Sequence, residues 1–199
     1  MKAQVVVFHQ VPVLPVVVPL AAVVLAALLW SLHRTRRLTA PRAVVALVLC
    51  VYVAGVVANT VFPVFTDKPA RSGAWGDALA LVPFAHYEVA DALMNVLVFA
   101  PLGVLVALLV PRARWWTALV VSAVFSLGIE LTQYVTAGLL GGGHVADVND
   151  LLSNVAGGVL GFLVLAALVR VPAVSALVDR FRWPPVTTGA RPSGVAVGA

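Results

Sequence analysis

Hydrophobic residues in this chain are concentrated in five long runs. The runs cover about residues 13–32, 43–62, 92–110, 115–135 and 151–171. Each is close to the roughly 20 apolar residues that an α-helix needs to cross the hydrocarbon core of a bilayer. The pattern therefore predicts an all-α fold, a polytopic transmembrane helical bundle with about five spans. The first run is too long for the core of a signal peptide, so we expect it to be an uncleaved span.

The composition supports a membrane protein. Of the 199 residues, 62% are hydrophobic and 11% are charged, whereas soluble domains are about half apolar and about a quarter charged. The net charge of +5 does not indicate a nucleic-acid partner, because the basic residues are scattered between apolar runs rather than gathered on one face. Cys50 is the single cysteine and lies inside an apolar run, so no intramolecular disulfide can form.

The basic residues predict the orientation of the bundle. Lys2, Lys68 and Arg71 lie in segments that five spans place on one side. The other side receives Arg34, Arg36, Arg37, Arg42, Arg112, Arg114, Arg170, Arg180, Arg182 and Arg191. Because Lys and Arg accumulate in cytoplasmic loops, we expect the N-terminus outside and the C-terminus in the cytoplasm.

Two parts follow from this pattern: a transmembrane domain over residues 1–171 and a cytoplasmic segment over residues 172–199. The apolar residues at the start of the second part have helical spacing and predict a short amphipathic helix on the inner leaflet: Val174, Leu177, Val178 and Phe181. The tail 184–199 is rich in Pro, Gly, Ser and Thr, which is typical of disorder.

The connector over residues 63–91 is long for a compact bundle and carries apolar and aromatic residues. Two interpretations remain open for it. It is either a surface loop in the headgroup layer or a lid over an outward-facing pocket.

Polar residues within the apolar runs are costly in a bilayer, so each one requires an explanation. The predicted orientation places all of the following near the outer leaflet: Asn95, Glu130, Gln133, His144, Asp147, Asp150 and Asn154. These seven residues are the candidate ligand-binding site. Glu130 is the first choice, because it lies inside its run with no Lys or Arg within one helical turn.

Structural roles compete with function at several of these positions. Asp147, Asn149 and Asp150 stand where a helix begins, and capping of free backbone N–H groups is expected there, above all from Asn149. Asn154 is expected to form a hydrogen bond to another helix beside Gly157 and Gly161, a spaced pair of small residues.

The pattern indicates neither a metal site nor a nucleophilic serine. His144 has acidic neighbours, but the sequence has no histidine or cysteine pair with ligand spacing, so no metal or other cofactor is expected. Ser126 and Ser153 lack the turn motif of a nucleophilic serine.

Four short strings together resemble the VanZ-like family of bacterial membrane proteins, and they span residues 81–161. They are LVPF, NVLVFAPLG, IELTQ and DVNDLLSNVAGGVLG, which begin at Leu81, Asn95, Ile129 and Asp147. The resemblance implies a helical membrane protein and a link to resistance against teicoplanin-type antibiotics. The resemblance also implies that the residues matching the family strings matter for structure or function: Asn95, Pro101, Gly103, Glu130, Gln133, Asp147, Asp150, Asn154 and Gly157. Relatives often carry an arginine where this chain has His144, which could pair with an acidic neighbour only when protonated.

The preferred hypothesis is a non-catalytic pocket in the outer leaflet that binds an amphiphile of the cell envelope. The candidate ligands are a membrane lipid, a cell-wall precursor and a lipoglycopeptide drug, and Gly157 with Gly161 offers a helix–helix contact. The alternative is an intramembrane enzyme that acts on an envelope lipid with Glu130 or Asp147 as general base. A small-solute carrier and a purely structural helper are further alternatives.

Overall fold

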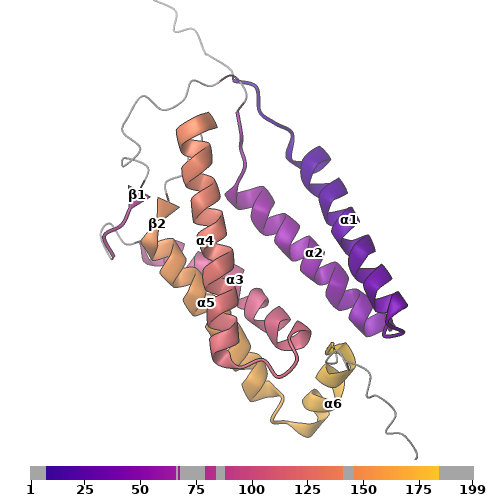
Figure 1. Cartoon of the computed structure of the whole chain (residues 1–199). Coiled ribbons are helices and arrows are strands. Elements are labelled where there is room, and N and C mark those ends of the chain that lie inside the picture. Colours follow the sequence, from indigo (N-terminus) through magenta and orange to yellow (C-terminus); the bar gives the residue numbers. More distant parts are fainter. Residues whose placement is uncertain (1–7, 66, 68–78, 84–87, 141–145, 184–199) are drawn as a thin grey trace, which may run out of the picture.

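A computed structural model describes residues 8–65, 67, 79–83, 88–140 and 146–183. The described chain is helical apart from two very short strands (Figure 1). The helices are α1 (Val13–Arg34), α2 (Ala40–Thr60), α3 (Val89–Leu109), α4 (Trp115–Leu140), α5 (Val148–Leu168) and α6 (Pro172–Phe181). The first five are long and apolar enough to cross a membrane, which confirms the predicted number of spans.

Helices α2, α3 and α5 each begin three residues before the corresponding hydrophobic run. The added turn contains one charged residue in each case: Arg42, Asp91 and Asp150. The free backbone N–H groups of a first helical turn carry partial positive charge, which favours Asp91 and Asp150 there. The guanidinium group of Arg42 instead donates to the carbonyl oxygens of Arg37 and Arg182. A hydropathy pattern therefore places the start of such a helix too late.

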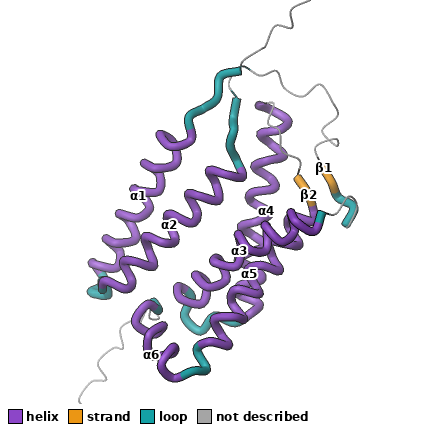
Figure 2. Tube along the Cα trace, turned by 180° about the vertical axis from the view of Figure 1, so that it is seen from behind, coloured by secondary structure: helices purple, strands orange, loops and turns teal. Residues whose placement is uncertain are grey.

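The centre of the molecule is formed by α3, α4 and α5, and α3 and α5 make the most extensive helix contact (Figure 2). The glycines of α5 allow this contact. A Cβ atom at Gly157 would overlap the backbone of Val96, and one at Gly161 would overlap the backbone of Ala100. The small-residue pair that the sequence shows is therefore used within the chain, where two backbones approach closely.

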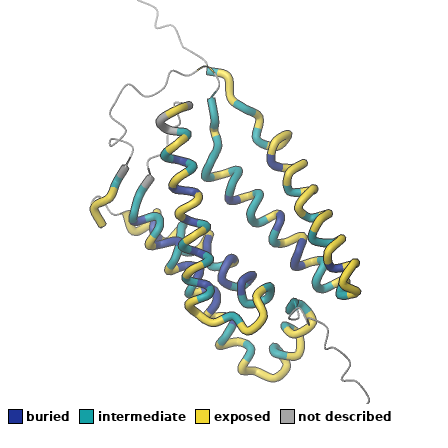
Figure 3. The backbone as a smooth tube through the Cα atoms, in the orientation of Figure 1, coloured by how far each residue is buried: buried dark blue, intermediate teal, exposed yellow. Residues whose placement is uncertain are grey.

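The α1–α2 hairpin contacts this centre only sparsely. An apolar cavity of about 630 Å³ separates α2 from α3 and α5, and Phe181 of α6 contributes to its wall. Buried residues are concentrated on α3, α4 and α5, whereas much of α1 is exposed (Figure 3). Exposed apolar side chains on these helices are expected in a protein that faces lipid.

The chain before α1 runs beside the chain after α2. The backbone N–H of Val11 donates to the carbonyl oxygen of Val64 at 2.9 Å. The backbone N–H of His9 donates to Oδ1 of Asp67 at 2.7 Å, and Nδ1 of His9 lies 2.7 Å from Oδ2 of the same carboxylate. This contact raises the pKa of His9 and lowers the pKa of Asp67. The pair is therefore ionic between those two pKa values, and it is lost as the pH falls below the lower one or rises above the higher one.

The two strands are β1 (Leu79–Ala80) and β2 (Ala146–Asp147), which pair in parallel with Ala80 beside Asp147. This pairing places a described part of the 63–91 connector next to the start of α5. Most of the rest of that connector lies outside the described residues, so its role as a lid stays a prediction. The tail 184–199 also lies outside them.

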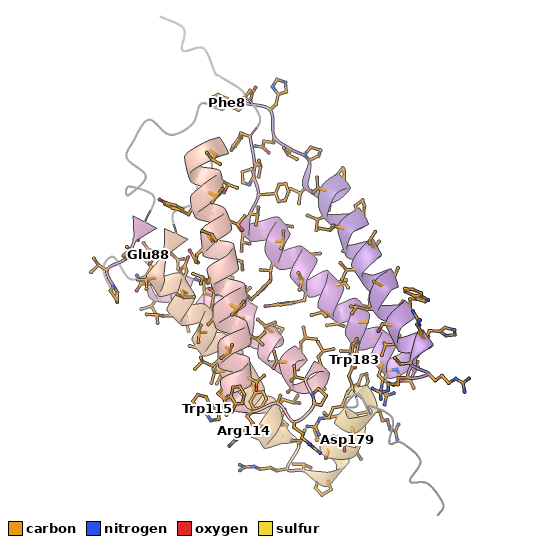
Figure 4. All side chains as sticks on the ribbon, in the orientation of Figure 1. Phe8, Glu88, Arg114, Trp115, Asp179 and Trp183 are labelled. Carbon is orange, nitrogen blue, oxygen red and sulfur yellow. The ribbon has the colours of Figure 1, made fainter. Side chains whose placement is uncertain are left out.

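The two ends of the bundle carry different charges. One end, which we call the basic end, contains the α1–α2 turn, the α3–α4 turn and α6, and Figure 4 shows Arg114, Asp179 and Trp183 there. Phe8 lies at the opposite end. That opposite end holds the N-termini of α3 and α5, and we call it the acidic end after Glu88, Asp91, Asp147 and Asp150. The predicted assignment of the basic end to the cytoplasm stays a prediction.

Candidate functional site

The start of α5 is capped by Asp147. Its Oδ1 accepts a hydrogen bond from the backbone N–H of Asn149 at 2.8 Å. The expectation that Asn149 would be the cap was wrong, because Asn149 is already inside the helix and is 8% exposed. An N-cap residue must lie just before the first helical turn, with extended backbone, and Asp147 meets this condition with φ −121° and ψ 127°.

Glu130 supports the same helix start from α4. Its side chain is 7% exposed, and its Oε2 accepts a hydrogen bond from the backbone N–H of Asp147 at 2.9 Å. Glu130 therefore accepts a hydrogen bond from the backbone of Asp147, and the side chain of Asp147 in turn accepts one from the backbone of Asn149. Glu130 consequently holds the carboxylate of Asp147 in position.

Asp150 is held from α3. Its Oδ1 accepts a hydrogen bond from Nδ2 of Asn95 at 2.7 Å. Hydrogen bonds to a charged acceptor are stronger than those between neutral groups. This bond connects the second turn of α3 to the first turn of α5, so Asn95 and Asp150 join the two helices.

Asn154 and Gln133 make contacts deeper in the bundle. Nδ2 of Asn154 donates to Oγ of Ser126 on α4 at 2.9 Å, which confirms the expected bond between helices. Nε2 of Gln133 donates to the carbonyl oxygen of Thr60, at the end of α2, at 3.0 Å. Gln133 therefore contacts a different helix from Glu130, although the two residues are three positions apart on α4.

Four carboxylates line a small cavity at the acidic end. The cavity has a volume of about 40 Å³ and is lined by Glu88, Asp91, Ala92, Asp147, Asn149, Asp150 and Ser153. No lysine or arginine is among these lining residues. The volume is enough for a water molecule or for an ammonium or hydroxymethyl group. We call it the carboxylate cavity.

Glu88 and Asp91 were not among the sequence candidates, although a signal for them exists. Glu88 and Asp91 are three residues apart at the start of α3, as Asp147 and Asp150 are at the start of α5. Two spans separated by one intervening span run in the same direction, so their N-termini meet at one end of a bundle. The repeated spacing therefore predicts that the four carboxylates gather.

The partial positive charge of the two helix N-termini offsets part of the negative charge of the cavity. Two of the carboxylates are also hydrogen-bonded, Asp147 to Asn149 and Asp150 to Asn95. The carboxylates of Glu88 and Asp91 make no hydrogen bond or ion pair within the described part of the chain. Within the described residues, Glu88 and Asp91 therefore have both carboxylate oxygens free to accept a hydrogen bond, whereas Asp147 and Asp150 each use one oxygen. No group of three or more His, Cys, Asp or Glu side chains among the described residues is arranged to hold a metal ion.

An apolar groove adjoins the carboxylate cavity. It has a volume of about 400 Å³ and is lined by Val89, Ala92, Leu93 and Val96 of α3 and by Asn149, Leu152, Ser153 and Ala156 of α5. Ala92, Asn149 and Ser153 line both spaces. The carboxylate cavity therefore continues into the apolar groove between α3 and α5. His144 lies outside the described residues and is not placed relative to this site.

Five long apolar helices, together with polar residues concentrated at one end of α3, α4 and α5, define a polytopic helical membrane protein. The family model for VanZ/LLP1 matches residues 21–170, and the chain belongs to this VanZ-like family. The match extends beyond the strings at residues 81–161 to include most of α1 and all of α2. Comparison with curated proteins and with solved structures finds no match.

Proposed function

We propose that this VanZ-like protein is a non-catalytic binding protein for an amphiphile of the cell envelope. The amine- or hydroxyl-bearing headgroup occupies the carboxylate cavity, and an apolar chain lies in the groove between α3 and α5. With the basic end in the cytoplasm, the site opens at the outer leaflet. The candidate ligands are an envelope lipid, a cell-wall precursor and a lipoglycopeptide antibiotic, and binding of the last would contribute to teicoplanin-type tolerance.

The observation that carries the proposal is the junction of the two spaces. Ala92, Asn149 and Ser153 line both the carboxylate cavity and the apolar groove. A ligand pocket of ordinary size is mainly apolar and has a few convergent polar groups. The groove volume of about 400 Å³ falls within the range of such pockets, which is about 300–1,000 Å³.

The contacts of Glu130 and Asp147 favour binding over catalysis. A general base needs a free lone pair within reach of the substrate proton. Glu130 does not line the carboxylate cavity, so its carboxylate is not placed beside a headgroup there. Asp147 does line the cavity, but its Oδ1 caps α5 by accepting the backbone N–H of Asn149. Both side chains thus support the shape of the site.

Asp91→Asn tests the headgroup part of the site. We expect binding of a primary alkylamine to weaken about tenfold or more, because a hydrogen bond to a charged group contributes about 1.5–3 kcal/mol. The stability of the variant should equal that of the wild type, since the Asp91 side chain is exposed and has no partner in the described chain. Isothermal titration of the purified protein in nanodiscs measures the affinity.

The matched control for Asp91→Asn is Asp67→Asn, which removes a carboxylate outside the carboxylate cavity. For the groove, Ala156→Phe should block the apolar chain, whereas Ala167→Phe on the same helix should not. If Asp91→Asn and Asp67→Asn bind the amine equally well, the headgroup assignment is wrong.

A further inference from the structure

A second cavity with polar groups lies at the basic end, away from the carboxylate cavity. It has a volume of about 360 Å³ and is formed by the end of α3, the α3–α4 turn, α5 and the residues after α6. Arg112, Arg182 and Trp183 line it, and most of the remaining wall is apolar, including Phe162 and Leu165. No aspartate or glutamate is among the lining residues. We call it the arginine cavity.

Two hydrogen bonds hold the wall of this cavity together. The backbone N–H of Trp183 donates to the carbonyl oxygen of Leu108 on α3 at 2.8 Å. Nε of Arg42 donates to the carbonyl oxygen of Arg182 at 3.1 Å. The segment after α6 is therefore attached both to α3 and to α2. The guanidinium group of Arg182 also contacts Asp179 at 2.8 Å, a carboxylate that does not line the cavity.

Arg112 is an exposed arginine in the wall of this cavity. Its φ of 58° lies in the left-handed region, which residues with a Cβ atom rarely adopt. Its guanidinium group has no hydrogen bond or ion pair in the described part of the chain. A glycine would suit this backbone better, and the arginine places a guanidinium group in the cavity wall that is free to bind an anion.

Trp183 adds a donor without an acceptor. Its indole Nε1 is buried and has no hydrogen-bond partner among the described residues. Buried donors are nearly always paired, so an unpaired one indicates a missing acceptor. Tryptophan is also enriched at the boundary between lipid and water, where one side of a site is apolar and the other is polar.

From these contacts we infer that the arginine cavity binds the phosphate group of an anionic lipid headgroup. Arg112 and Arg182 supply the positive charge, and Trp183 supplies an additional N–H donor. Guanidinium groups suit phosphate because they donate several hydrogen bonds in one plane. The apolar wall from Phe162 and Leu165 favours a phosphate that is carried on a lipid. This site is independent of the amphiphile site at the acidic end.

The decisive variant is Arg112→Gly, which removes the guanidinium group and relieves the left-handed backbone. Native mass spectrometry of the full chain, with phosphatidylglycerol and phosphatidylcholine of equal chain length as probes, measures the lipids retained. We expect the wild type to prefer phosphatidylglycerol by about tenfold, the effect of about one charge-assisted contact. Arg112→Gly should lose this preference, and Trp183→Phe should lose part of it.

Arg114→Gln is the matched control, because Arg114 is an exposed arginine of the same turn that does not line the arginine cavity. It should keep the preference of the wild type. Thermal unfolding shows whether Arg112→Gly remains folded. We expect that it does, because glycine adopts a φ of 58° more readily than arginine. Equal preferences in Arg112→Gly and Arg114→Gln would overturn the inference. Inorganic phosphate that binds as tightly as phosphatidylglycerol would overturn the assignment to a lipid.

Discussion

Gly161→Ala should destabilise the protein by about 2 kcal/mol or more, although alanine is the better helix former. A Cβ atom at Gly161 would overlap the carbonyl oxygen of Ala100 and would lie 2.9 Å from its Cα. Both of these atoms belong to the backbone of α3, so no side-chain rotation can relieve the contact. The two helices would have to separate along the most extensive contact in the bundle.

Two other glycines provide the control for Gly161→Ala. Gly55 of α2 and Gly128 of α4 have no atom within 4 Å of an added Cβ. The same substitution there should leave the stability unchanged or increase it by up to about 1 kcal/mol through helix propensity. Unfolding in mixed detergent micelles, followed by far-UV circular dichroism, compares the three variants. Equal stabilities for Gly161→Ala and Gly55→Ala would disprove the proposed α3–α5 contact.

Glu130→Ala should lower both the stability and the binding of an amphiphile, whereas Glu130→Gln should preserve most of both. The alanine variant leaves the part-buried backbone N–H of Asp147 without its acceptor, and an unsatisfied donor of this kind costs about 1–3 kcal/mol. It also releases Asp147, whose carboxylate lines the carboxylate cavity. Glutamine retains an oxygen that can accept the same bond.

The pair of Glu130 variants also separates a positioning role from catalysis. Stability is measured by unfolding in micelles, and affinity by titration with the alkylamine. A general base must lose its activity in Glu130→Gln, because an amide cannot take up a proton at neutral pH. If Glu130→Gln has wild-type stability but no longer binds the amphiphile, then the charge of Glu130 acts on the ligand directly and the positioning role is wrong.

Hydropathy alone predicted the five spans, because in a bilayer the length of an apolar run is set by the thickness of the hydrocarbon core. The alternation of spans also predicted that Glu130, Asp147 and Asp150 lie at the same end of the bundle. The bond of Asn154 to another helix could be predicted because a polar side chain inside a span requires a partner. The partner itself, Ser126, could not be identified in this way.

Other features depend on packing that the sequence does not reveal. Glu130 and Gln133 share one face of α4 by spacing. Glu130 nevertheless contacts the start of α5 and Gln133 contacts the end of α2, because α4 lies between those two helices. The cap was assigned to Asn149 because the helix start was placed too late. The arginine cavity requires the segment after α6 to fold back onto α3, and no local pattern indicates that contact.

In the proposed function, the carboxylate cavity and the apolar groove bind one amphiphile through its headgroup charge and its chain. The most direct test is the affinity of the wild-type protein in nanodiscs for a primary alkylamine and for an alkyl sulfate with the same chain. We expect saturable binding of the amine, at least about tenfold tighter than that of the sulfate, because four carboxylates should repel the sulfate. Equal affinities for the two amphiphiles would show that the carboxylates do not recognise the headgroup, and the proposed site would be wrong.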